Sequence, residues 1–87
     1  MILIDVRSPA EFAGGALEGA LNVPLSELQS QISSVATDKQ APIVLYCASG
    51  GRSGMGCALL QQMGYPNVTN AGGLFAAAAQ LNIRICT

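Results

Sequence analysis

The fold is decided by one stretch near the middle of the chain, Ile43-Val44-Leu45-Tyr46-Cys47-Ala48-Ser49-Gly50-Gly51-Arg52-Ser53. Its first part, Ile43–Tyr46, is apolar at every position, which is typical of a central parallel strand covered on both faces. The loop Cys47–Arg52 then leads into a helix predicted over about Ser53–Met63. This order of strand, loop and helix indicates an α/β fold. The residues expected to form the buried stripe of the helix are Gly56, Leu59, Leu60 and Met63.

The segment before this stretch contains two further predicted strands. Ile2–Val6 is a short β-branched run that ends at a turn, so it predicts a buried strand. Ser8–Glu11 has the pattern of a capping box with proline at the first helical position, which predicts a very short helix. Gly14-Gly15 ends that helix, and Gly19–Pro24 predicts a brief strand closed by its proline.

A longer amphipathic helix is predicted between this segment and the central strand. Its apolar positions recur at helical spacing, and they are Leu25, Leu28, Ile32 and Val35. Ser26 and Gln29 have the spacing of a second capping box, which predicts where this helix begins. Asp38–Pro42 is a polar connection to the central strand.

The C-terminal part continues the alternation of strands and helices. Asn67–Asn70 predicts a weak strand, Ala71–Gly73 a tight turn and Leu74–Leu81 a short Ala-rich helix. The tail Asn82–Thr87 is compatible with a last edge strand or with packed coil. The whole pattern predicts a small, mostly parallel β-sheet flanked by helices on both faces, in a single domain over residues 1–87.

The charge balance excludes several classes of function. The 87 residues include four Lys and Arg, five Asp and Glu and no His, and the net charge is −1. A generic nucleic-acid binder needs a basic patch, so no nucleic-acid partner is expected. The absence of histidine excludes a Ser-His-Asp triad, a Cys-His dyad and a His-ligated metal, and no metal site is expected.

Compartment and cysteine usage follow from the same composition. No apolar run approaches the roughly 20 residues of a membrane-spanning helix, and Met1–Asp5 lacks the basic region of a signal peptide. We therefore expect a cytoplasmic protein without a membrane partner, with a periplasmic location as the alternative if a leader has been removed. Cys47, Cys57 and Cys86 form an odd set without a CxxC pair, which argues against a disulfide framework and a zinc site.

Cys47 is the cysteine whose position predicts chemistry. It follows a buried strand and precedes a helix, and ligands bind at the carboxyl ends of strands in open α/β sheets. The small residues of the loop allow several backbone N–H groups to point at one centre, and the helix dipole adds roughly half a positive charge there. Together with the Arg52 guanidinium, these groups should lower the thiol pKa below its free value of about 8.5 and so create a nucleophile.

Four segments of the chain resemble the signature segments of the rhodanese family, in the same order. They are Cys47–Ser53, which is similar to the active-site loop, Asp5-Val6-Arg7, Gly19–Pro24, and Gly64-Tyr65 leading to Val68 and Ala71–Gly73. The resemblance covers Ile2 through about Leu74. The short length makes the chain most similar to single-domain rhodaneses of the phage shock protein E type.

This resemblance implies a rhodanese-like sulfurtransferase without a cofactor. Cys47 would attack the sulfane sulfur of a donor such as thiosulfate, become a persulfide, and pass the sulfur to cyanide or a thiol. Arg52 would neutralise the sulfonate of the donor. The backbone N–H groups implied to cradle the outer sulfur are those of Ala48, Ser49, Gly50, Gly51, Arg52 and Ser53.

Two alternatives to a free-standing sulfurtransferase stay open. The domain could be a persulfide carrier or docking module for a protein acceptor in a sulfur relay, because a carrier needs the same Cys47 loop. A Cys-dependent phosphatase or arsenate reductase is less favoured, since phosphatases that share this fold place one residue more between Cys and Arg than the four found here.

Some positions depart from the family pattern or have an open role. Ala16 stands where many rhodaneses carry His, and Ala77 stands where many carry Trp, which suggests a more open pocket wall. Asp5 and Arg7 would either contribute to substrate electrostatics or form a local ion pair that fixes a turn. Cys57 would be buried packing or a resolving thiol for a Cys47 persulfide, and Cys86 is interpreted as incidental.

Overall fold

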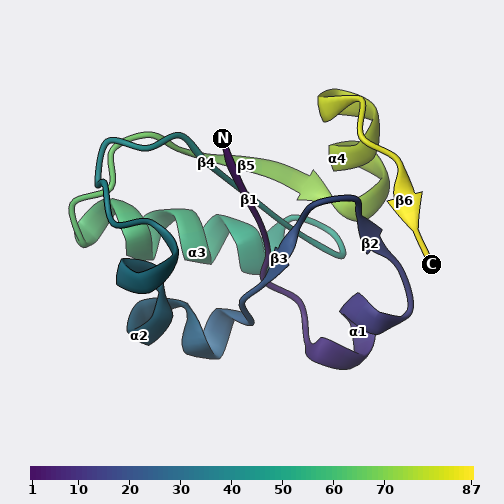
Figure 1. Ribbon diagram of the computed structural model, residues 1–87, viewed down its shortest axis with the longest axis horizontal. Coiled ribbons are helices and arrows are strands. Elements are labelled where there is room, and N and C mark those ends of the chain that lie inside the picture. The colour runs from purple at the N-terminus through teal and green to yellow at the C-terminus, as the bar shows by residue number, and fades with distance from the viewer.

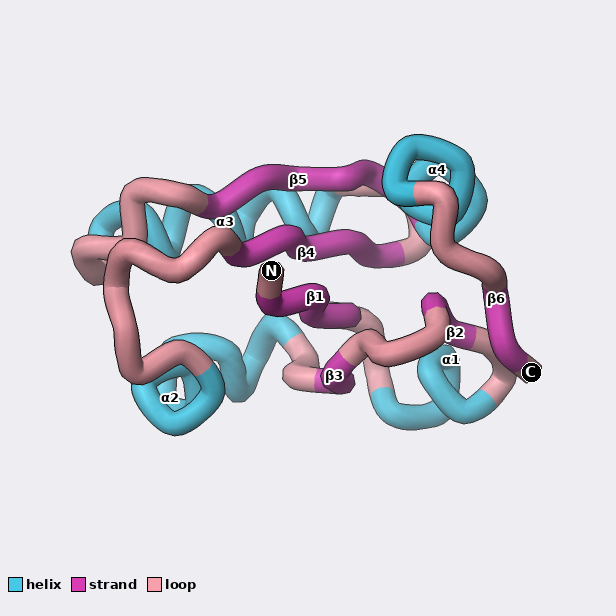
Figure 2. Tube along the Cα trace, turned by 45° about the horizontal axis from the view of Figure 1, so that its top comes forward, coloured by secondary structure: helices cyan, strands magenta, loops and turns pink.

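Four parallel strands form the central sheet of the protein, whose computed structural model describes all residues 1–87. The strands are β1 (Ile2–Asp5), β3 (Leu21–Asn22), β4 (Ile43–Cys47) and β5 (Val68–Gly73). Their order across the sheet is β3-β1-β4-β5, and Figure 2 shows them following one another in that order. Because β1 and β4 are neighbouring parallel strands, the loops that follow them open at the same edge of the sheet.

Helices cover both faces of this sheet, as predicted. They are α1 (Pro9–Ala13), α2 (Leu25–Val35), α3 (Gly51–Gln62) and α4 (Leu74–Leu81). Figure 1 shows α2 and α3 together, whereas α4 lies apart from them beside a second, two-stranded sheet. That sheet pairs β2 (Ala16–Leu17) antiparallel with β6 (Ile85–Cys86), so the tail forms a strand outside the main sheet. No helix is long and apolar enough to cross a membrane.

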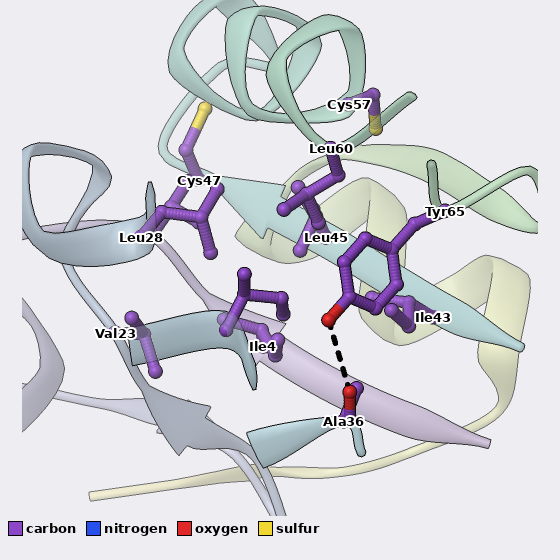
Figure 3. Packing of buried hydrophobic residues seen from close by; sticks show 12 residues of the cluster. Ile4, Val23, Leu28, Ala36, Ile43, Leu45, Cys47, Cys57, Leu60 and Tyr65 are labelled. Carbon is purple, nitrogen blue, oxygen red and sulfur yellow. Dashed lines mark hydrogen bonds between the residues drawn. The ribbon is translucent and has the colours of Figure 1, made fainter. Parts of the chain in front are cut away.

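The side chains of β4 alternate between two buried clusters, which explains why the strand is apolar at every position. Ile43, Leu45 and Cys47 join a cluster with Leu28 of α2 and Leu60 of α3. In this cluster Tyr65 donates a hydrogen bond to the carbonyl of Ala36 over 3.0 Å (Figure 3). The second cluster, on the other face, consists of Leu3, Leu17, Val44, Tyr46, Ala71 and Ala77.

The predicted capping box at the start of α2 is wrong. The helix begins at Leu25 with Pro24 as its N-cap, and no side chain caps it, so Ser26 and Gln29 lie within the first turns. The physical reason is a tertiary contact, since the Leu25 N–H donates to the carbonyl of Val6 over 3.0 Å. A backbone carbonyl at the exit of β1 therefore satisfies the first N–H of the helix, and the helix begins one residue before the predicted N-cap Ser26.

The predicted tight turn at Ala71–Gly73 is also wrong, because β5 continues through Gly73 and α4 follows directly. Gly73 is paired with Cys47 of β4. A Cβ atom on Gly73 would overlap the carbonyl oxygen of Ala48, so only glycine allows this approach. The glycines at the end of β5 thus support the loop after Cys47.

The buried stripe of α3 is shifted from the predicted one. Ser53, Gly56, Cys57 and Leu60 are buried, whereas Leu59 and Met63 are only partly buried. A Cβ atom on Gly56 would lie 2.8 Å from Cδ1 of Leu45, so this glycine lets α3 approach β4 closely. As a result, the N-terminus of α3 lies next to the end of β4.

Candidate active site

Cys47 occupies the last position of β4, at the edge of the sheet where the loops of β1 and β4 open. Only 1% of the residue is exposed. In Figure 3 its sulfur atom points away from the packed side chains of Ile4 and Leu45 and toward the start of α3. The backbone N–H of Gly50 donates a hydrogen bond to Sγ over 3.0 Å. The loop therefore folds back over the cysteine that precedes it.

Gly50 of the loop is required by the geometry of the backbone. Gly50 has φ 100° and is the N-cap of α3, and this left-handed conformation is one that favours glycine. A Cβ atom at Gly50 would lie 3.3 Å from Cα of Gly72, so the loop packs backbone to backbone against the end of β5. This close packing fixes the direction of the Gly50 N–H toward the sulfur.

The environment of Cys47 lowers the pKa of its thiol to about 7. Burial by itself raises this pKa, because the charged form loses hydration. Hydrogen bonds from the Ser53 hydroxyl and from the N–H groups of Ser53, Ser49 and Gly50 outweigh burial, since they favour the thiolate. A pKa of about 7 gives a substantial thiolate fraction at neutral pH, and the thiolate is the reactive form of cysteine.

Asn70 of β5 organises the polar groups beside Cys47, and sequence analysis did not identify it. Its Nδ2 donates to the carbonyl of Gly50 over 3.1 Å, and its Oδ1 accepts the Gly72 N–H over 2.9 Å. These two contacts fix the orientation of the amide. Ser53 Oγ lies 2.7 Å from Oδ1 of Asn70 and 3.4 Å from Sγ of Cys47. Asn70 and Sγ therefore compete for the single hydroxyl proton of Ser53, whereas the backbone N–H groups have no such competing acceptor.

Arg52 lies at the rim of the site and is paired with Glu11 of α1. Nη1 donates to Oε1 over 2.8 Å and Nη2 donates to Oε2 over 3.0 Å, which is a bidentate pair. Sequence analysis assigned Glu11 only to the capping box with Ser8. That capping box is present, and the same carboxylate also pairs with the guanidinium.

Asp5 and Arg7 form a buried ion pair at the exit of β1. Nη2 of Arg7 lies 2.7 Å from Oδ2 of Asp5, and the side chains are 7% and 0% exposed. The same Nη2 donates to the carbonyl of Gly15 over 2.6 Å, and the guanidinium stacks over the ring of Tyr46 at 5.8 Å. These contacts favour a role in fixing the turn after β1.

Only some of the residues predicted to surround the Cys47 sulfur contact it in the structure. Gly50 and Ser53 contact the sulfur, and the N–H of Ser49 contributes to its electrostatic environment. Ala48 has its carbonyl against Gly73, and no hydrogen bond joins Ala48, Gly51 or Arg52 to Sγ. No group of three or more His, Cys, Asp and Glu side chains is placed to hold a metal ion.

The other residues discussed in the sequence analysis do not contact the Cys47 sulfur. Cys57 is buried in the cluster with Leu60, and burial raises the pKa of its thiol. Cys86 is exposed on β6, and all three cysteines are free. The expectation that Ala77 opens a pocket wall is wrong, because Ala77 is fully buried against Tyr46 in the second cluster.

Comparison with known proteins places this arrangement in a family. The family model described as a rhodanese-like domain matches residues 1–80 of this chain. Thiosulfate sulfurtransferase PspE of Escherichia coli is 41% identical over 71 residues, which are 82% of this chain and 68% of that protein. Human thiosulfate:glutathione sulfurtransferase is 33% identical over 85 residues, covering 84% and 74% of the two chains.

A solved structure gives the same result for the three-dimensional fold. The structure described as a rhodanese with anions from E. coli superposes with a TM-score of 0.91 and 35% identity, and covers 99% of this chain and 96% of that one. The α/β fold of this chain, with its central parallel sheet and its helices, is thus shared with a chain of related sequence. The chain belongs to the rhodanese family of sulfurtransferases.

Proposed function

We propose that this protein is a thiosulfate sulfurtransferase that carries a sulfane sulfur on Cys47 and delivers it to cyanide or a thiol. The observation that carries the proposal is the position of the Cys47 sulfur, which accepts the Gly50 N–H over 3.0 Å and has a pKa of about 7. A thiolate at the centre of a backbone cradle is suited to accept and hold one sulfur atom.

In the first half-reaction the thiolate attacks the outer sulfur of thiosulfate. A bond forms between Sγ and that sulfur, the sulfur–sulfur bond of thiosulfate breaks, and its electron pair leaves with sulfite. The product is a Cys47 persulfide anion, so the total charge of the reactants is conserved. Donors with two negative charges would be stabilised by Arg52 and by the N-terminus of α3.

In the second half-reaction the acceptor takes the outer sulfur. Cyanide or a thiolate forms a bond to that sulfur, the sulfur–sulfur bond of the Cys47 persulfide breaks, and its electron pair returns to Sγ. The product is thiocyanate or a new persulfide, and the enzyme is regenerated without a cofactor or a change in net oxidation state. The names of the E. coli and human relatives support thiosulfate as donor and a thiol such as glutathione as acceptor.

Access to the sulfur sets a requirement for this reaction. Because Cys47 is only 1% exposed, the loop Ala48–Gly51 must move aside before a donor reaches Sγ. The loop has glycine at two successive positions, Gly50 and Gly51, and a Cβ on Gly51 would meet nothing within 4 Å. Free space for this movement is therefore present next to Gly51, whereas Ala48 and Gly50 are packed against the end of β5.

Intact-mass measurement tests the proposal directly. The protein is incubated with thiosulfate, and we expect a gain of one sulfur atom that cyanide then removes. Cys47→Ser is expected to show no gain. Absence of a cyanide-removable sulfur in the wild-type protein would contradict the proposal. Steady turnover with cyanide or glutathione identifies a free-standing enzyme, whereas turnover only with a protein acceptor identifies the persulfide carrier.

The loop length favours sulfur over phosphate as the bound group. Four residues separate Cys47 from Arg52, and the sulfur already accepts an N–H from within this short loop. A tetrahedral phosphate ester needs a wider ring of donors. Competing thiosulfate and phenyl phosphate assays on the same protein separate the two activities, and hydrolysis of the ester without sulfur loading would overturn our assignment.

A further inference from the structure

The guanidinium of Arg52 is already occupied on the side that an anion would use. Both terminal nitrogens donate to the two carboxylate oxygens of Glu11, over 2.8 and 3.0 Å. A sulfonate would seek the same bidentate geometry, because the guanidinium offers its parallel N–H groups there. An anionic donor therefore meets an arginine whose preferred face is shared with a carboxylate of the protein.

Glu11 is the fixed member of this pair. Its Oε1 also accepts the backbone N–H and the hydroxyl of Ser8, each over 3.1 Å, so the carboxylate is tied to the start of α1. The guanidinium and Ser8 together lower the pKa of Glu11 to about 2, so the group stays ionised at every working pH. When an anion competes for Arg52, it is the arginine that has to turn.

No other cation of the chain can replace Arg52 at the site. Arg7 is paired with Asp5 over 2.7 Å, and Arg84 is paired with Glu18 over 3.1 Å. The fourth positive side chain, Lys39, donates to the carbonyl of Met63 at the opposite end of α3. With Glu11 in place, the side chains around Cys47 carry paired charges, and the backbone N–H groups and the helix dipole are the remaining positive contributions.

We propose that Glu11 is a specificity-determining residue that competes with the donor's anionic group for Arg52 and so reduces the preference for dianionic over monoanionic donors. This inference rests on the proposed function of the Cys47 site. It names the kind of donor that the site discriminates, by charge. Glu11 acts through Arg52 and is not itself a catalytic residue.

Glu11→Gln tests the proposal with a conservative change. Glutamine at this position keeps a capping box with Ser8, so α1 is retained, while the negative charge is removed. Sulfur loading of Cys47 is measured with thiosulfate, a dianion, and with methanethiosulfonate, a monoanion. We expect kcat/KM for thiosulfate to rise roughly 2- to 5-fold, as for loss of a partly exposed ion-pair partner, with a smaller rise for the monoanion. Glu11→Gln should therefore raise the ratio of kcat/KM for thiosulfate to kcat/KM for methanethiosulfonate, and Arg52→Ala should lower it.

A second readout does not depend on sulfur transfer. Alkylation of Cys47 by iodoacetate, an anion, is compared with alkylation by the neutral iodoacetamide, and the ratio of rates cancels the opening of the loop that both reagents need. Glu11→Gln should raise this ratio at Cys47. The matched control is Glu18→Gln, which removes the partner of Arg84 next to Cys86. That control should leave the ratio at Cys47 unchanged.

The two readouts separate failure of this inference from failure of the proposed function. If the wild-type protein does not load sulfur, the proposed function is wrong, and the alkylation ratio still decides whether Glu11 sets the charge preference at Cys47. If Glu11→Gln slows thiosulfate loading as strongly as Arg52→Ala, Glu11 holds Arg52 in its productive position and competition is refuted. An unchanged donor ratio and an unchanged alkylation ratio would also overturn the proposal.

Discussion

Two buried cysteines, Cys47 at the end of β4 and Cys57 within α3, have thiol pKa values shifted in opposite directions. Cys47 is 1% exposed and has a pKa of about 7, whereas Cys57 is 8% exposed and has a pKa raised by burial. The difference lies in the backbone. Cys47 follows a strand and meets the unpaired N–H groups at the start of α3, while Cys57 lies within the helix, where these groups bond to carbonyls. Burial alone therefore does not decide reactivity.

The largest expected effect separates the two residues by function. Cys47→Ser should abolish sulfur loading from thiosulfate, because no other thiol meets the loop N–H groups. Cys57→Ser should keep most of the activity, since Cys57 packs in the core and contacts no part of the loop by hydrogen bond. Intact mass after thiosulfate treatment measures both variants. Loss of loading in Cys57→Ser with a folded protein would contradict the comparison.

A substitution in β5 should remove the cradle without touching either cysteine. Gly73→Ala places a Cβ atom against the carbonyl of Ala48, so the loop has to move and the Gly50 N–H loses its direction toward Sγ. We expect at least a 10-fold loss in loading rate, which corresponds to about 1.4 kcal/mol. Stopped-flow loading kinetics measure this loss.

Gly51→Ala is the matched control for this substitution. A Cβ on Gly51 meets nothing within 4 Å, and the residue lies in the first turn of α3. This variant should load sulfur at a rate close to the wild type. A comparable loss in both variants would show that any added methyl group in the loop region disturbs the site.

The pH dependence of alkylation measures the difference in pKa between the thiols of Cys47 and Cys57. The Cys47 thiolate is favoured by folding, so its fraction should rise as the pH rises through about 7. The folded state gains stability from this group as the pH rises from about 7 toward the unfolded value of about 8.5, and that gain is lost as the pH falls through 7. Iodoacetamide labelling followed at each cysteine measures the midpoints. A Cys47 midpoint near the free value would refute the cradle.

The smallest expected effect concerns the Ser53 hydroxyl. Because Asn70 and Sγ compete for its proton, Ser53→Ala should raise the pKa of Cys47 by less than about one unit. The Gly50 N–H stays in place and keeps the thiolate stabilised. Labelling rates against pH give the shift. A larger rise would show that the hydroxyl donates mainly to the sulfur.

Sequence patterns predicted the parts of the molecule that depend on neighbouring residues. The apolar run Ile43–Tyr46 gave the central strand, and Ser8 and Glu11 gave the capping box of α1. The predicted start of α2 was wrong because the partner of the Leu25 N–H is Val6, which is distant in the sequence and follows β1. Local patterns do not contain such tertiary partners.

The same limit explains what was missed at the candidate site. Glu11 lies 41 positions before Arg52, and Asn70 lies 17 positions after Ser53. Neither residue has a local pattern that connects it to the loop. Pairing of β4 with β5 and the short loop after β1 bring these residues to Cys47, so a three-dimensional structure was needed to find them.

The small sheet of β2 and β6 has a consequence for how the chain folds. It joins residues from opposite ends of the sequence, so its formation requires closure of nearly the whole chain, at an entropic cost that only the finished main sheet can offset. The strands have two residues each, which makes this pairing a late step and a weak one. Local opening of the C-terminal strand is therefore expected at a lower free energy than global unfolding, and this strand can exchange its amide protons or be cut while the four-stranded sheet and Cys47 stay intact.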